Sequence, residues 1–428
     1  MRTAALHNLG CKVNSYETEA MQQLLEEAGY EIVPFHEKAD VYIINTCSVT
    51  NIADRKSRQM LHRAKKQNPD AVVVAAGCYV QAAAEELKAD LAVDVIIGNN
   101  KKQDLVPILE EYFKDKSDRS HVIEISETHE YERLSIHKIA DHTRAFLKIQ
   151  DGCNQFCSYC IIPYTRGRVR SRRPDEVVAE VRELATAGYQ EVVLTGIHLS
   201  SYGVDFKEEE KKENLLSLIK QVHEVEGIRR IRLGSLEPRI ITEEFAQALA
   251  SMPKFCPHFH LSLQSGCDKT LKRMNRHYTT EEYAAGCEIL RRYFDNPAIT
   301  TDVIVGFPGE TEEEFEETKA FLERIGFYEM HIFKYSRRAG TRADRMPEQV
   351  PEQVKSVRSE VLLKLEKQMS KAYRESFSGK KKTVLLEEKT EIGGRAYMIG
   401  HTMEYVKAVV PYADNLKNKM TEDRKSVV

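Results

Sequence analysis

The sequence predicts an α/β protein in three parts: an N-terminal open parallel sheet, a central partial (β/α)6 barrel and a small C-terminal β-barrel. Two series of alternating strand-like and helix-like segments, separated by a charged stretch, predict the first two parts, since βα repeats build parallel sheets. A long helical pattern followed by short strands predicts the third. The length of 428 residues accommodates several domains. We expect boundaries at residues 1–115, 139–371 and 372–428, with a linker over 116–138.

The first part reads as repeated βα units. We expect a capping box at Asn14 and Glu17 to start a helix that ends at Gly29. The other expected elements are strands at 3–9, 41–45 and 71–76, a helix that ends before Pro69, and a helix over 81–89.

The second part offers six strands, too few for a closed eight-stranded barrel, so an open three-quarter barrel fits. The expected strands are 145–150, 191–199, 229–236, 258–264, 299–305 and 328–335. The helical segments between them lie near 175–187, 214–226, 242–251, 280–292 and 312–325.

The strand 258–264 alternates polar and apolar residues, so His258, His260, Ser262 and Gln264 share one face. The apolar face of such a strand packs on the surrounding helices, which turns the polar face inward. We therefore expect a polar lumen that holds a ligand. The two histidines could bind a metal, but without a third ligand, hydrogen bonding in the cavity is favoured.

The third part follows a helical pattern over 351–377, which Ser378 and Gly379 break. Three lysines, Lys380, Lys381 and Lys382, precede expected strands near 383–388, 395–400 and 405–411. Small β-barrels of this kind often bind single-stranded or looped RNA, so we expect these lysines to contact RNA.

The amino-acid composition indicates which classes of protein the chain can belong to. With 42% hydrophobic and 30% charged residues, the chain reads as globular, and a net charge of −3 argues against coating nucleic acid through bulk positive charge. No export signal or bilayer-length apolar run is visible, which favours a cytoplasmic protein with no membrane partner. Nine cysteines, an odd number, then indicate thiolate ligands and buried thiols rather than disulfides.

Three cysteines, Cys153, Cys157 and Cys160, stand on one short loop with x3 and x2 spacing. Three thiolates can hold three irons of a [4Fe–4S] cluster and leave the fourth iron open to an outside ligand, such as S-adenosylmethionine. The alternative is zinc, which in structural sites takes four ligands. The nearest histidines, His142 and His198, lie outside any compact zinc spacing.

Three further cysteines, Cys11, Cys47 and Cys78, each come just after an expected strand of the N-terminal sheet. The carboxyl ends of parallel strands share one edge, where ligands bind, so these thiols can converge on a second cluster. The alternative is that each is a small buried apolar residue. Cys256, Cys267 and Cys287 lack such placement, and we expect them to be core or partly buried thiols.

Ends of the barrel strands supply candidates for the cofactor site. Glycine allows close approach of a ligand to the backbone, and a carboxylate accepts hydrogen bonds from a ribose or an amino group. The candidates are Thr195, Gly196, Ser235, Glu237, Gln264 and Gly306, together with Tyr159 of the cysteine loop.

Alternating arginines, Arg166, Arg168, Arg170 and Arg172, follow the cysteine loop. On an extended segment they would share one face and could contact an RNA backbone. The alternative is a solvated segment paired with nearby acidic residues such as Glu180.

The motifs Leu9-Gly-Cys-Lys-Val-Asn14, Asn45-Thr-Cys47, Ala76-Gly-Cys78, 152–167 and Leu194-Thr-Gly196 together resemble those of the radical-SAM methylthiotransferases. The resemblance covers essentially the whole chain and implies a radical-SAM core and a C-terminal RNA-binding TRAM domain. It implies that Cys153, Cys157 and Cys160 hold the [4Fe–4S] cluster that cleaves S-adenosylmethionine. Cys11, Cys47 and Cys78 would hold an auxiliary [4Fe–4S] cluster that delivers sulfur.

The resemblance also implies the reaction: a 5′-deoxyadenosyl radical activates a C–H bond, the auxiliary cluster supplies sulfur, and a second S-adenosylmethionine supplies methyl. Implied partners are an electron donor such as flavodoxin or ferredoxin, and a sulfur donor or iron–sulfur assembly proteins. Residues 9–18 and 164–172 look most like the branch that acts on the anticodon stem-loop of tRNA carrying N6-threonylcarbamoyladenosine.

Three alternatives stay open: the isopentenyladenosine-tRNA branch, the branch that modifies a ribosomal-protein aspartate, and a non-catalytic module that binds RNA and iron–sulfur clusters. The chain departs from the family at its end. Thr421–Val428 reads as polar and non-strand, so the TRAM-like region is expected to lack its last strands.

Overall fold

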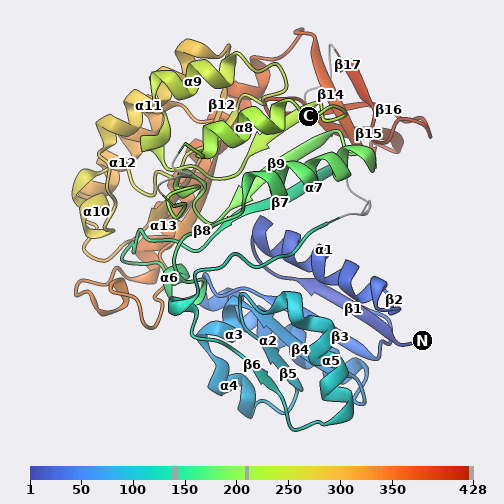
Figure 1. Cartoon of the computed structure of the whole chain (residues 1–428). Helices are drawn as coiled ribbons and strands as arrows, with labels where there is room; N and C mark the ends of the chain where they lie inside the picture. The colour runs from blue at the N-terminus through green and yellow to red at the C-terminus, as the bar shows by residue number, and fades with distance from the viewer. Residues whose placement is uncertain (137–142, 208–211, 424–428) are drawn as a thin grey trace.

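The computed structural model describes residues 1–136, 143–207 and 212–423, and it has the three expected parts (Figure 1). The first is a six-stranded parallel sheet in the order β2-β1-β3-β4-β5-β6. Its elements are β1 Thr3–Asn8, α1 Lys12–Glu27, β2 Glu31–Ile32, β3 Val41–Thr46, α2 Asn51–Gln67, β4 Val72–Gly77, α3 Cys78–Ala82, α4 Ala84–Ala89, β5 Val95–Ile97, α5 Leu105–Lys114 and β6 Ser120–His121.

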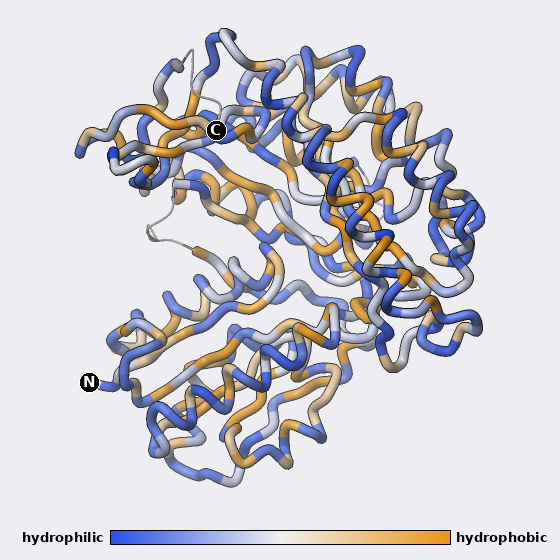
Figure 2. Tube along the Cα trace, turned by 180° about the vertical axis from the view of Figure 1, so that it is seen from behind, coloured by the Kyte–Doolittle hydropathy of each residue, from blue (hydrophilic) through white to orange (hydrophobic). Residues whose placement is uncertain are grey.

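Helices cover both faces of this sheet, which explains why β3 and β4 are buried along their whole length. Val41 and Ile43 pack with α1 and α5, whereas the alternate residues Tyr42 and Ile44 pack with α2, α3 and α4. The strands are accordingly apolar over most of their length (Figure 2). The open parallel sheet predicted from sequence is confirmed.

The start of α1 differs from the prediction. The helix begins at Lys12 with Cys11 as its N-cap residue, and no side chain caps it. Asn14 is buried and its Nδ2 donates to the Leu9 carbonyl at 2.7 Å and the Thr46 carbonyl at 3.0 Å, while Glu17 is fully buried. The capping box is therefore wrong, because these two polar residues bond to other parts of the chain.

The segment before residue 137 packs between the first two parts. Leu134 and Ile136 join the same core as Tyr16 of α1, whose hydroxyl donates to the Leu134 carbonyl at 2.5 Å. The expected linker is thus an ordered connection over its described residues. Its last residues, 137 and 138, and His142 lie outside the described part of the chain.

The central part is a partial barrel, as predicted. Its strands form a β10-β9-β7-β8 sheet and a β11-β12-β13 sheet, which parallel bridges at Ile231–Phe255 and Leu236–Leu261 connect. The elements are β7 Arg144–Asp151, α6 Ile162–Thr165, β8 Arg170–Ser171, α7 Pro174–Thr186, β9 Glu191–Gly196, α8 Leu215–His223, β10 Arg230–Leu233, α9 Glu243–Ala250, β11 His258–His260, α10 Asp268–Arg273, α11 Thr280–Tyr293, β12 Ala298–Val305, α12 Glu312–Ile325 and β13 Glu329–Lys334.

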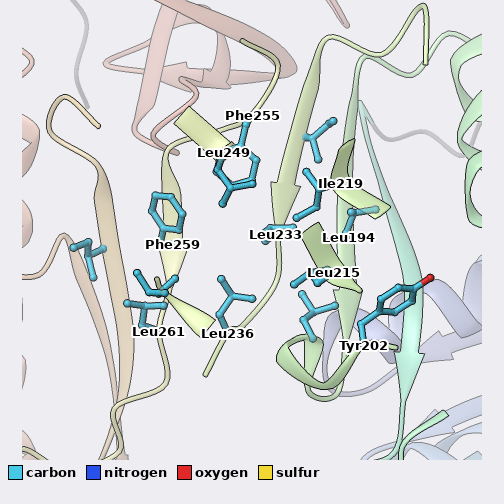
Figure 3. Close-up of a cluster of buried hydrophobic side chains, with 14 of the residues drawn as sticks. Leu194, Tyr202, Leu215, Ile219, Leu233, Leu236, Leu249, Phe255, Phe259 and Leu261 are labelled. Carbon is cyan, nitrogen blue, oxygen red and sulfur yellow. The ribbon is translucent and has the colours of Figure 1, made fainter. Parts of the chain in front are cut away.

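The barrel core lies between the strands and the outer helices. Leu194 and Leu233 from the strands meet Leu215 and Ile219 of α8, and Phe259 of β11 lies on the other side of the same cluster, near Leu261 (Figure 3). The predicted strand 258–264 is shorter than expected, because β11 ends at His260 and Gln264 takes a positive φ of 72°. Its apolar residues Phe259, Leu261 and Leu263 are fully buried, as the alternation predicts.

The last part is a four-stranded antiparallel sheet that follows the long helix α13 Glu352–Glu375 in the chain. Its strands are β14 Lys382–Ile392, β15 Arg395–His401, β16 Lys407–Pro411 and β17 Met420–Asp423, in the order β16-β15-β14-β17. The non-strand character predicted for 421–428 is wrong up to residue 423, because β17 pairs with the basic start of β14. Residues 424–428 lie outside the described part.

The antiparallel sheet is held on the barrel by buried arginines. Arg230 donates to the carbonyls of His401 and Thr383 at 2.8 and 2.7 Å, and Arg232 donates to that of Met403 at 2.9 Å. Over the ranges that the structure describes, none of the helices is long and apolar enough to cross a bilayer.

Candidate functional site

The loop that follows β7 brings its three cysteines to one cavity of about 130 Å³. Cys153, Cys157 and Cys160 line this cavity together with residues from the ends of β10 and the segment after β11. Four of the predicted cofactor residues share the lining: Tyr159, Ser235, Glu237 and Gln264. Burial raises the pKa of Cys153 to about 11, which is the expected effect of desolvation on a thiol without a metal.

An arginine that the sequence analysis missed also lines this cavity. Arg276 donates from Nη1 to the Cys157 sulfur at 3.2 Å and from Nε to the Tyr278 hydroxyl at 3.0 Å. Arg276 was missed because it follows the short helix α10, which was not predicted. The basic residues around it also look like an ordinary helix end. Glu237 lines the same cavity, so opposite charges flank the cysteines.

His198 lies beside Glu237, with Nε2 at 3.9 Å from the carboxylate Oε2. Its Nδ1 bonds the Ser201 hydroxyl at 2.7 Å, whereas Nε2 is buried without a hydrogen-bond partner among the described residues. Burial lowers the pKa of His198 to about 4, so the ring is neutral at pH 7.

Three other predicted cofactor residues, Thr195, Gly196 and Gly306, lie outside the cavity lining. A Cβ at Gly196 would lie 2.9 Å from the Gln150 side chain, and one at Gly306 would lie 2.3 Å from Lys355. Side chains of the protein thus occupy the space that a Cβ would need at both glycines, and the approach of a ligand to their backbone stays a prediction. Thr195 is buried within β9.

The other three cysteines converge as predicted. Cys11, Cys47 and Cys78 follow β1, β3 and β4, which are neighbours in the sheet. A Cβ at Gly10, whose φ is +117°, would lie 3.0 Å from the Cys47 sulfur, so glycine is needed for the close approach of the first two loops. Burial, and then the neighbouring Cys78, raise the pKa of Cys47 to about 11.

The structure corrects the arginine prediction. Arg166, Arg170 and Arg172 are buried, because α6 and the positive φ of Gly167 keep the segment from being one extended strand. Arg172 pairs with Glu180, in agreement with the alternative reading of the sequence. A role in RNA contact is therefore wrong for these three. Arg168 alone of the four is exposed, and its guanidinium lies 4.6 Å from the Phe156 ring.

Arg166 lies between the two cysteine sites. Its Nη1 donates to Glu17 Oε1 of α1 at 2.8 Å and to Asp151 Oδ1, just before the cysteine loop, at 3.1 Å. The nearby Cys78 and Glu17 raise the pKa of Arg166, which burial alone would lower. The guanidinium thus connects the helix that starts at Cys11 with the strand that ends before Cys153.

Glu17 is the centre of this buried network. Lys148 and Lys102 lie 2.8 and 3.0 Å from its carboxylate oxygens, in addition to Arg166. Burial by itself raises the pKa of a carboxyl, but these cations hold the pKa of Glu17 well below its ordinary value. Each of the four side chains is almost fully buried.

Two of the predicted RNA-contacting lysines are paired within the protein. Lys381 pairs with Glu422, and Lys382 pairs with Glu404. Lys380 is exposed, and its ammonium lies 5.8 Å from the Phe377 ring. Lys381 is also exposed, as is its partner Glu422, so Lys380 and Lys381 both stay accessible to an RNA, whereas Lys382 pairs with a buried carboxylate.

The two histidines expected to face the barrel lumen, His258 and His260, have different surroundings. His258 stacks on Tyr405 at 5.1 Å between ring centroids, and His260 Nδ1 bonds the Thr300 hydroxyl at 3.0 Å. Ligand atoms of His260, Asp302 and His331 lie within 4.8 Å of one another, so the fold supplies the further ligands that the sequence did not show. The hydrogen bond to Thr300 agrees with the favoured reading of the sequence for His260, although His260 is not among the residues that line the cysteine cavity.

Family models match two stretches of the chain. Residues 147–322 match the Radical SAM superfamily, and residues 3–98 match a family described as Uncharacterized protein family UPF0004. These stretches contain one cysteine triad each. Among solved structures, the radical S-adenosylmethionine methyltransferase TsrM from Kitasatospora setae is similar with a TM-score of 0.59, 18% identity, and coverage of 80% of this chain and 77% of that chain. This likeness shows the fold.

Curated relatives match nearly the whole chain. The threonylcarbamoyladenosine tRNA methylthiotransferase MtaB of Bacillus subtilis is 43% identical over 99% of this chain and 93% of its own length. MtaB of Aquifex aeolicus is 42% identical over 91% of this chain and 93% of its own. A tRNA-2-methylthio-N(6)-dimethylallyladenosine synthase of Moorella thermoacetica is 38% identical over 90% and 87%. The chain therefore belongs to the radical-SAM methylthiotransferase family.

Proposed function

We propose that the protein converts N6-threonylcarbamoyladenosine next to the anticodon of tRNA to its 2-methylthio derivative. The observation that carries the proposal is the 43% identity with the Bacillus subtilis enzyme over 99% of this chain. The fold agrees with it, because both cysteine triads are assembled and the buried network of Glu17 and Arg166 connects them.

Enzymes of this family use S-adenosylmethionine and two [4Fe–4S] clusters, and the residues present fit these groups. Cys153, Cys157 and Cys160 would hold one cluster, since all three line one cavity and no fourth cysteine lines it among the described residues. The convergent Cys11, Cys47 and Cys78 would hold the other. When bound, these groups supply radical activation of a C–H bond, the sulfur and the methyl group.

The protein's own contribution at the first site is binding and orientation. The amino-acid end of S-adenosylmethionine carries an ammonium and a carboxylate, and Glu237 and Arg276 offer the complementary charges in one cavity. Ser235 and Gln264 add neutral polar groups. Burial raises the pKa of Tyr159 well above its ordinary value, so its hydroxyl stays protonated in this lining.

The arrangement of the parts suggests their roles. Residues 1–115 would carry the sulfur-delivering cluster, residues 139–371 the radical-SAM core, and residues 372–428 an RNA-binding domain. Lys380 and Arg168 are exposed and stay candidates for RNA contact. A fixed spacing between the two cysteine sites is required, since sulfur must reach the same carbon that loses hydrogen.

Two further partners complete the proposal. An electron donor such as flavodoxin or ferredoxin would reduce the first cluster, and a sulfur donor or an iron–sulfur assembly system would restore the second. We place the reaction in the cytoplasm, where tRNA and a reducing environment for the free thiols are both found.

A second candidate substrate is tRNA that carries N6-dimethylallyladenosine, also called isopentenyladenosine. The observation that favours it is the 38% identity with the Moorella thermoacetica synthase over 90% of this chain. The identities of 43% and 42% with the MtaB proteins of Bacillus subtilis and Aquifex aeolicus make the threonylcarbamoyl substrate the first choice.

The test is anaerobic turnover of the reconstituted enzyme with S-adenosylmethionine, a reductant and each of the two tRNAs, followed by mass spectrometry of the nucleosides. We expect a methylthio product from threonylcarbamoyl tRNA. Product from the dimethylallyl tRNA alone would overturn the substrate assignment. Clusters whose spectrum does not respond to S-adenosylmethionine, with no product from either tRNA, would instead favour the non-catalytic module.

A further inference from the structure

Helix α2 concentrates positive charge in a chain whose net charge is −3. Its 17 residues include six lysines and arginines and one acidic residue, Asp54, which gives the helix a net charge of +5. Asp54 faces inward and pairs with Arg338, so it does not neutralise the outer face. The helix therefore forms a local basic surface, which the net charge of the whole chain does not reveal.

Four of these basic residues, Arg55, Lys56, Arg63 and Lys66, are exposed at helical spacing on the outer face. None of the four forms an ion pair with an acidic group within the ranges that the structure covers. From Arg55 to Lys66 the helix rises about 16 Å, which spans several phosphates of one nucleic-acid strand. We call these four residues the α2 basic face.

The helix starts at the sulfur-delivering site. Cys47 precedes its N-cap Thr50 by three positions, and between them Val49 is 57% exposed. Ile52 in the first turn is 58% exposed. Exposed apolar side chains of this size beside a reaction centre suit contact with a planar, apolar partner such as a nucleobase.

The first turns of α2 and the helix after the radical-SAM loop line one surface cavity of about 860 Å³. Asn51 and Arg58 of α2 face Tyr164 of α6 across it, together with Arg338 and Gly340. Tyr164 is 52% exposed and lies edge-on to Phe156 with ring centroids 5.8 Å apart. The cavity therefore adjoins both cysteine sites and offers an aromatic ring for stacking.

We propose that the α2 basic face binds the phosphate backbone of the anticodon stem-loop and that loop bases lie over Val49, Ile52 and Tyr164. The inference rests on the proposed function for its tRNA substrate. Unpaired basic side chains bind phosphates, and unstacked loop bases stack on aromatic side chains. Basic side chains follow the length of α2, whereas exposed apolar side chains lie at its start near Cys47. This distribution suits an RNA whose phosphate backbone runs along the helix and whose loop bases reach the reaction site.

The test compares two triple variants of the full-length enzyme. Arg55→Gln/Lys56→Gln/Arg63→Gln removes three charges from the α2 basic face. Lys364→Gln/Lys367→Gln/Lys371→Gln removes three exposed charges from α13 and is the matched control. The affinity for threonylcarbamoyl tRNA is measured by fluorescence anisotropy at several salt concentrations. Circular dichroism and tRNA-independent cleavage of S-adenosylmethionine check that each variant is folded.

We expect the α2 variant to bind the tRNA roughly tenfold more weakly at low salt, with a salt slope that falls by about one for each phosphate that the protein no longer neutralises. The control should bind like the wild type. A second variant, Tyr164→Ala, should weaken binding without changing the salt slope. If the triple variant fails to fold, Tyr164→Ala still tests the docking surface.

Equal affinity and equal salt slope for the α2 and α13 variants would overturn the docking surface. So would an α2 variant that binds tRNA normally but is reduced more slowly by flavodoxin, since the face would then belong to the electron donor. The two proposals fail separately. Normal product formation with unchanged binding by the α2 variant overturns the docking surface alone, whereas α2-dependent tRNA binding without methylthio product overturns the proposed function alone.

Discussion

Replacement of Glu17 by glutamine tests whether this residue caps a helix or neutralises a buried charge network. A capping role would make the loss about 1 kcal/mol. In the structure its carboxylate lies 2.8 Å from Arg166 and Lys148 and 3.0 Å from Lys102. Removal of one partner from such a buried group costs about 3–5 kcal/mol, because charge is left unpaired away from water.

The three cations are not affected equally. Arg166 and Lys148 keep Asp151 as an ion-pair partner. Lys102, which is fully buried, keeps no ion pair among the described residues and retains the Asn99 side-chain oxygen at 2.6 Å. The loss should therefore come mainly from Lys102, and we expect the free energy of unfolding to fall by about 4 kcal/mol.

The assay is equilibrium urea unfolding of the wild type and Glu17→Gln, followed by tyrosine fluorescence, since the chain has no tryptophan, and by circular dichroism. Glu27→Gln, an exposed change on the same helix, is the matched control and should shift the free energy by less than about 0.5 kcal/mol. A loss of about 1 kcal/mol or less in Glu17→Gln would refute the network and restore the capping role.

Three other predictions concern the two cysteine sites and the side chains around them. Cys157→Ala should abolish S-adenosylmethionine cleavage, whereas Cys47→Ala should spare cleavage and lose sulfur insertion; both products are followed by mass spectrometry, and cleavage by Cys157→Ala would contradict the assignment. Arg276→Met should raise the KM for S-adenosylmethionine at least about tenfold, since a charged hydrogen bond is removed, and Arg276→Lys should recover part of it; an unchanged KM would rule out the interaction. Burial lowers the pKa of His198 to about 4 from 6.5, so the unfolded chain takes up a proton on this ring at a higher pH than the folded protein does. The stability that the neutral ring contributes is therefore fully present above pH 6.5 and is lost as the pH falls toward 4. Between pH 7 and pH 5 the cluster-free wild type should therefore lose about 2 kcal/mol more than His198→Asn in urea unfolding, and equal losses would refute this pKa.

The local pattern of apolar and polar residues was sufficient to predict most helices and strands of the fold. The βα repeats, the six barrel strands and the start of the C-terminal sheet follow from periodicity and from glycine and proline breaks, which depend on neighbours in sequence. Short pieces such as α10 and β17 were missed, because a few residues carry little periodic signal. The two cysteine triads were also visible, since their ligand spacing and their position after strands are local properties.

The roles of charged side chains depended on tertiary contacts. Arg166 and Glu17 are 149 residues apart, so nothing local showed that they neutralise each other. The arginine stripe looked exposed and is largely buried, whereas the α2 basic face went unnoticed because its exposure depends on how α2 packs on the N-terminal sheet. The sequence by itself determined the chemistry, in the form of two sets of three thiolates on a radical-SAM fold. Only the tertiary structure decided which charges hold these sets together and which remain free for an RNA, because burial and pairing are set by residues far apart in the chain.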